Sequence, residues 1–82
     1  MCRAEITMIR EVYPHRLHLF YDVTHLLTLA QLGEKGVKVM HQVNMFRHIF
    51  EILVFNSNIY LAFKSGEIDF WEVHNLQNNP FV

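Results

Sequence analysis

Cysteine is almost absent from this chain, and its scarcity limits the chemistry available. Cys2 is the single cysteine among 82 residues. One thiol cannot form a disulfide within the chain, nor can it supply the paired cysteines of a Cys-x-x-Cys redox or zinc site. The sequence therefore excludes an intrachain disulfide and dithiol chemistry.

Charge is also scarce, at 18% of the residues, where about 25% is usual for a soluble domain. Seven basic residues stand against eight acidic ones, which gives a formal net charge of −1. The basic residues are scattered along the chain. Because nucleic-acid binding normally needs a positive stripe that displaces counterions, we expect no nucleic-acid partner.

Long uninterrupted apolar segments are missing as well. The most apolar region, residues 49–63, contains Glu51 and the polar triplet Asn56-Ser57-Asn58. A membrane-spanning helix needs about 20 consecutive apolar residues, and no segment has the pattern of a secretory signal peptide. We therefore expect no membrane partner and, by elimination, a cytoplasmic location.

The chain is instead rich in apolar residues, with 51% hydrophobic and 13% aromatic residues. A domain of this length buries only about 60% of its unfolded surface. We therefore expect some apolar side chains to form an exposed patch or to be covered by a partner. A symmetric homodimer is the commonest cover, and a tightly packed monomer is the alternative. We expect one compact domain over residues 1–73 and a loose polar tail over 74–82.

Two strands are expected at the start of the chain. Residues 4–13 alternate moderately, and residues 16–23 alternate clearly, because Leu17, Leu19, Tyr21 and Val23 recur at period two. Pro14 interrupts the pattern between them, since proline removes a backbone donor. The two strands are expected to form a hairpin across this turn.

A helix is predicted next, over residues 24–32. Val23, Leu26, Leu27 and Ala30 fall at the spacing of one helical face. Thr24 or Asp22 could cap its beginning, and Gly33 stands where a C-terminal glycine would end it. The valine-rich residues 37–43 then predict a strand, so the segment reads as a right-handed βαβ unit with parallel strands.

Residues 44–55 fit two structures. A helix through about Leu53 is favoured, although Ile49, Leu53 and Phe55 also fit a strand, and periodicity does not separate the two in short apolar runs. Residues 59–64 and 67–73 predict a C-terminal β-hairpin around Gly66. The fold class predicted is α/β, with α+β as the alternative, built on a small mixed sheet.

This predicted order resembles the thioredoxin fold. The stretch Ile59-Tyr-Leu-Ala-Phe-Lys-Ser-Gly-Glu-Ile is similar to the final hairpin of that family. The first predicted helix has no cysteine, and the proline expected before the third strand is missing. The resemblance therefore implies a thioredoxin-like binding domain without redox activity.

A second resemblance arises from the same region. Residues 66–73, Gly-Glu-Ile-Asp-Phe-Trp-Glu-Val, are similar to the strand that ends a blade of a WD-type β-propeller. Gly36 also opens a predicted strand, 30 positions before Gly66. Because 82 residues cannot close a propeller, this resemblance implies assembly of several chains.

Six histidines are the compositional oddity of the chain. His48 and Glu51 are three positions apart and could share a metal on the possible second helix, but no spacing of three or four ligands is evident. His41 lies in an apolar row and is predicted to be a structural histidine, hydrogen-bonded through one ring nitrogen. Glu67 and Asp69 lie on one side of a predicted strand, where acid–base catalysis or a solvated acidic face is possible.

Large aromatic side chains concentrate on the last hairpin, at Tyr60, Phe63, Phe70 and Trp71. Such residues are favoured binding anchors, so we predict that they form a protein-binding surface. The leading interpretation is a non-catalytic interaction module without cofactor, self-associating and binding a further protein. The alternatives are a metal-dependent or acid–base enzyme using histidines with Glu51 or the pair Glu67 and Asp69, and an assembling propeller-like fragment.

Overall fold

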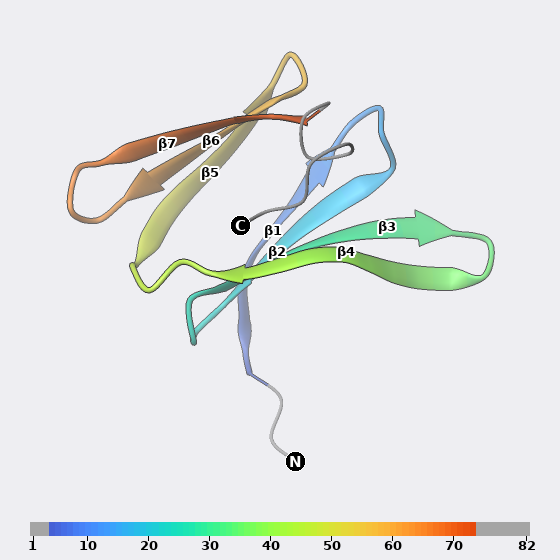
Figure 1. Cartoon of the computed structure of the whole chain (residues 1–82), viewed down its shortest axis with the longest axis horizontal. Helices are drawn as coiled ribbons and strands as arrows, with labels where there is room; N and C mark the ends of the chain where they lie inside the picture. Colours follow the sequence, from blue (N-terminus) through green and yellow to red (C-terminus); the bar gives the residue numbers. More distant parts are fainter. Residues whose placement is uncertain (1–3, 74–82) are drawn as a thin grey trace.

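The computed structural model describes residues 4–73 and shows seven strands in two antiparallel sheets (Figure 1). The first sheet has the order β1-β2-β3-β4, and the second has the order β5-β6-β7. The strands are β1 Ile6–Val12, β2 Leu17–Asp22, β3 Leu26–Gly33, β4 Gly36–Asn44, β5 Ile49–Phe55, β6 Asn58–Phe63 and β7 Ile68–Glu72.

The predicted α/β fold is wrong. The segment predicted as the first helix forms β3, and the segment predicted as the second helix ends in β5. No helix occurs among the strands of residues 4–73, and β3 pairs antiparallel with both β2 and β4, so no βαβ unit exists. The thioredoxin-like interpretation fails with it. The final hairpin is present, formed by β6 and β7.

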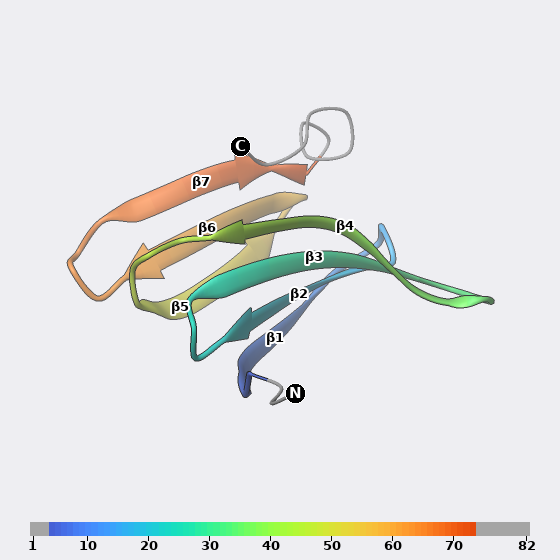
Figure 2. The same cartoon turned by 60° about the horizontal axis from the view of Figure 1, so that its bottom comes forward.

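Each sheet is a meander in which every strand pairs with the next one along the chain. The connections are correspondingly short. Asn56 and Ser57 join β5 to β6 with φ values of 50° and 62°, the positive values that a two-residue hairpin turn requires at both positions. The two sheets form two layers (Figure 2).

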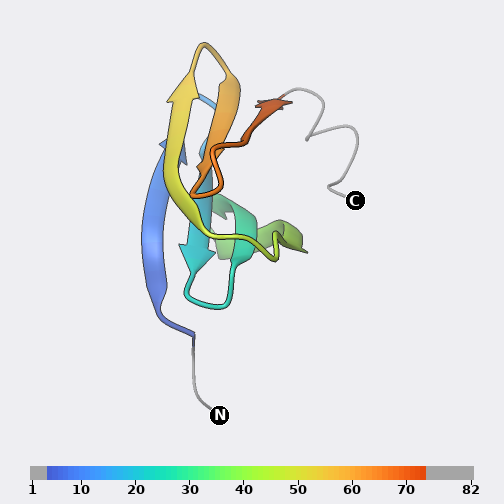
Figure 3. The ribbon, with the colours of Figure 1, turned by 90° about the vertical axis from the view of Figure 1, so that its left-hand side faces the viewer.

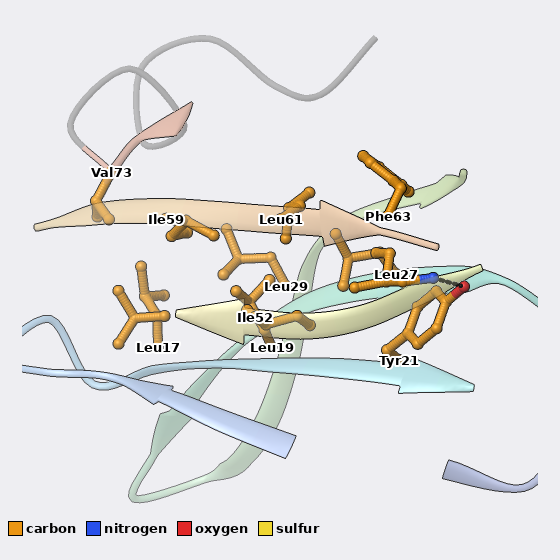
Figure 4. Packing of buried hydrophobic residues seen from close by; sticks show 12 residues of the cluster. Leu17, Leu19, Tyr21, Leu27, Leu29, Ile52, Ile59, Leu61, Phe63 and Val73 are labelled. Carbon is orange, nitrogen blue, oxygen red and sulfur yellow. Dashed lines mark hydrogen bonds between the residues drawn. The ribbon is translucent and has the colours of Figure 1, made fainter. Parts of the chain in front are cut away.

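A single apolar core fills the space between the layers. Alternate residues of β2 and β3 point toward the second sheet, and alternate residues of β6 point back toward the first (Figure 4). The fully buried side chains are Val12, Leu17, Leu19, Tyr21, Leu27, Leu29, Ile49, Ile52, Ile59, Leu61, Phe63 and Val73. Because both sheets supply this cluster, each covers the apolar face of the other.

Two polar side chains join the sheets around this core. The Tyr21 hydroxyl donates to the Arg47 carbonyl at 2.6 Å and accepts from the Ile49 amide at 3.0 Å. Arg10 donates through Nε to the Ile52 carbonyl at 3.0 Å, which ties β1 to β5. These bonds satisfy backbone groups at the inter-sheet contact, where an unpaired group would be costly.

The sheets meet along their first strands. Among the described residues, β1 and β5 are the pair of strands from different sheets in closest backbone contact. Both strands run in the same direction, as Figure 1 and Figure 3 show. From this contact the sheets continue to β4 and β7 as their last strands. The two sheets therefore meet at the same end of their strand order.

The hairpins β2–β3 and β6–β7 repeat one register at a spacing of 41 residues. This 41-residue repeat does not extend to β1 and β5, because Val12 pairs with Leu17 whereas Leu53 pairs with Tyr60 and not with Asn58. Asn58 lies 41 positions after Leu17, and its partner Glu72 lies 41 positions after Gln31, the partner of Leu17. The same shift converts all five cross-strand pairs of β2 and β3 into those of β6 and β7. The spacing of 30 between Gly36 and Gly66 is not this repeat, because Gly36 begins the fourth strand of one sheet and Gly66 precedes the third strand of the other.

Candidate interaction surface

The four aromatic residues predicted as a binding surface lie on opposite sides of the second sheet. Phe63 is fully buried, and Trp71 packs against the core from β7. Tyr60 and Phe70 point away from the first sheet and contact each other, with ring centroids 5.2 Å apart. Only this second pair is placed on an outward-facing surface.

The outward side of the second sheet is apolar, and we call it the second outer face. Tyr60 pairs with Leu53 on one neighbouring strand and with Phe70 on the other. The large exposed side chains of the second outer face, between 48% and 68% accessible, are Leu53, Phe55, Ile68 and Phe70. Glu51, Asn58 and Glu72 lie among them at the margins. An apolar centre with a polar rim is the usual composition of a protein interface.

The outward side of the first sheet is also apolar, and we call it the first outer face. Ile9 pairs with Phe20 across β1 and β2, and Ala30 pairs with Val39 across β3 and β4. The large exposed side chains of the first outer face, between 37% and 64% accessible, are Ile9, Leu32, Val37 and Val39. Polar groups on this side include Glu11 and His18, whose carboxylate and Nε2 are 3.8 Å apart. Both sides of the two-layer structure thus carry hydrophobic residues.

Sequence reasoning missed most of these residues. Leu53 and Phe55 belong to the strand alternative for residues 44–55, whereas the sequence alone favours a helix there. Their spacing at period two is the signal that identifies them. Phe46, in the connection between β4 and β5, is 84% exposed. Its amide donates to Asn44 Oδ1 at 2.8 Å, and its φ is 55°.

The predicted metal ligands are not gathered into a site. Glu51 accepts a hydrogen bond from Arg10 at 3.3 Å and one from the Ile52 amide, so its carboxylate already has partners. His48 lies before β5 and meets the His25 ring edge-on, with centroids 6.2 Å apart. Within residues 4–73, no group of three potential metal-ligating side chains comes together. His41 is half-buried on β4, opposite Leu29.

The acidic pair of β7 and its turn shares one cation. Arg47 contacts Glu67 at 3.3 Å and Asp69 at 3.1 Å. Its guanidinium also lies 3.6 Å from the centre of the Phe63 ring. Two carboxylates held by one guanidinium are paired charges, so this arrangement links the β4–β5 connection to β7 and closes one end of the core.

No protein-family model matches the chain, and no curated protein or solved structure matches it. Residues 4–73 include no helix that is long and apolar enough to cross a membrane. Cys2 and the predicted tail over residues 74–82 lie outside the described residues.

Proposed function

We propose that this chain is a non-catalytic interaction module that associates with itself through the second outer face. The observation that supports this most directly is the concentration of large exposed apolar side chains around the Tyr60–Phe70 contact. A soluble monomer rarely leaves such a patch in water. Large aromatic and aliphatic side chains at the centre of a patch are also the residues that dominate binding energy.

The arrangement of charge supports the same proposal over an enzymatic one. The carboxylates that were candidates for metal or acid–base chemistry, Glu51 and the pair Glu67 and Asp69, each contact an arginine. Each of these carboxylates thus has a charged partner within the chain. The exposed hydrophobic residues, by contrast, have no role in the core of the single chain.

The experiment is sedimentation velocity over a concentration series. The wild type is expected to sediment as an oligomer, and Ile68→Glu is expected to shift it to the monomer because it places a charge among the exposed apolar side chains of the second outer face. Val23→Glu is the matched control, since Val23 is 52% exposed in the turn after β2 and lies outside the face. A wild type that remains monomeric at every concentration would disprove self-association.

A further inference from the structure

We propose that copies of the chain pack head to tail, with the second outer face of one copy covering the first outer face of the next. The proposal rests on the self-association proposed above and specifies its geometry. The occupant of each exposed face is then a second copy of this chain, and the contact joins two different surfaces.

The 41-residue repeat supplies the first argument. Leu19 and Leu29, which pair on the inner side of the first sheet, correspond to Tyr60 and Phe70, which pair on the outer side of the second. The surface that the first sheet offers to the second is therefore repeated on the second sheet, facing outward. It is placed to receive a following sheet in the way that the first sheet receives the second.

The side-chain chemistry of the corresponding positions supplies the second argument. Tyr21 and Leu27 correspond to Ala62 and Ile68, so the repeated surface is largely apolar in both sheets. Only Leu17, which corresponds to Asn58, changes from apolar to polar within this set of inward residues. The outward side of the second sheet therefore has a composition that suits packing against another sheet.

The presence of two exposed apolar faces supplies the third argument. A symmetric contact through the second outer face alone would leave the first outer face uncovered. One head-to-tail contact covers one face of each kind.

The contact between β1 and β5 indicates how such packing would close. An added copy that repeated this contact would bring its own first strands beside β1 and β5. A ring of about four to eight antiparallel four-stranded sheets is the architecture of a β-propeller. This chain supplies one sheet of four strands and, within residues 4–73, one of three, so about two to four copies would supply the number of sheets in such a ring.

The test uses one variant for each face. Val39→Glu places a charge on the first outer face, and Ile68→Glu places one on the second. In a head-to-tail assembly each variant alone loses every intact contact and is expected to be monomeric. An equimolar mixture retains one intact pair of faces and is expected to form a heterodimer, detected by native mass spectrometry with one variant isotopically labelled.

The possible outcomes separate the two proposals. A wild type that is monomeric would overturn both. A wild type that is oligomeric while Val39→Glu remains equally oligomeric would support self-association and overturn the head-to-tail geometry, as would a mixture that stays monomeric. The fluorescence of Trp71, which packs against the core, verifies that each variant is folded. If either variant unfolds, Ile9→Glu and Leu53→Glu replace it on the first and second outer faces.

Discussion

At the residue scale, Tyr21 combines core packing with a polar link between the sheets. Its ring is fully buried, and its hydroxyl bonds two backbone groups at the beginning of β5 (Figure 4). Tyr21 therefore positions the second sheet as well as filling space.

Replacing this hydroxyl tests its contribution. Tyr21→Phe keeps the ring but leaves the Ile49 amide and the Arg47 carbonyl without this partner. We expect a loss of roughly 1–3 kcal/mol in the free energy of unfolding, because a buried group left unpaired retains its desolvation cost. Chemical denaturation measures the loss. Tyr13→Phe, at a tyrosine that is 77% exposed in the turn after β1, is the control and is expected to change stability little.

Asp22 is the one charged side chain that the described residues bury, at 7% exposure. Burial alone raises the pKa of its carboxyl, but hydrogen bonds from the Thr24 hydroxyl and from the amides of Leu26 and Thr24 lower it more, and the positive field of His25 adds to them. The net result is a pKa below the ordinary value of 3.8. These bonds hold the turn between β2 and β3.

The lowered pKa predicts an acid-dependent loss of stability. The carboxylate stabilises the fold at all pH values above its unfolded pKa, and this contribution disappears as pH falls through the lower folded value. Denaturation between about pH 5 and pH 2 is expected to show a steeper loss for the wild type than for Asp22→Asn. Parallel profiles for the two proteins would contradict this account of Asp22.

At the scale of elements, the turns determine which strands pair. Gly66 lies between β6 and β7 with a φ of 97°, a conformation that side chains with a Cβ rarely adopt, although a Cβ there would meet no atom within 4 Å. Gly66→Ala is therefore expected to destabilise the protein by about 1–2 kcal/mol through backbone strain alone.

Gly33→Ala provides the comparison for this substitution. Gly33 ends β3 without a positive φ, and an added Cβ would meet only the Gly36 carbonyl oxygen at 3.9 Å. We expect a smaller change in the midpoint of thermal unfolding than for Gly66→Ala. Equal losses for the two variants would show that the turn at Gly66 does not require its backbone conformation.

The same scale explains which elements sequence reasoning could identify. The strands β1 and β2 and the final hairpin alternate at period two and were found from it. The helix prediction for β3 is wrong because this strand has apolar residues on both sides, so that Leu26, Leu27 and Ala30 also fit the spacing of a helical face. The capping interaction predicted for Asp22 does form, but in a turn and not at the beginning of a helix. Its carboxylate accepts hydrogen bonds from the Thr24 and Leu26 amides.

The second helix was mistaken for a related reason. β5 has a register shift between Ile49 and Glu51, which places apolar residues at spacings that imitate a helical face. Local periodicity could not reveal that a second sheet covers the first, because that cover comes from residues about 40 positions away in the chain. The residues of the two outer faces could therefore be identified only from the register in which the strands pair.

At the scale of the whole molecule, the two sheets depend on one core. The inner apolar side of each sheet is shielded from water by the other sheet, because both sheets supply the buried cluster. Leu61→Ala removes a fully buried side chain from the second sheet and is expected to cost about 2–5 kcal/mol.

Because the core is shared, this cost should appear in both sheets at once. Trp71 fluorescence reports on the second sheet and far-ultraviolet circular dichroism on all strands, so their denaturation midpoints are expected to shift together. The same measurement on Leu19→Ala, from the first sheet, should move the Trp71 signal by a similar amount. A Trp71 transition that separates from the circular dichroism transition in either variant would mean that the sheets unfold independently, and the packing of one sheet on the next would then not be the interaction that stabilises the fold.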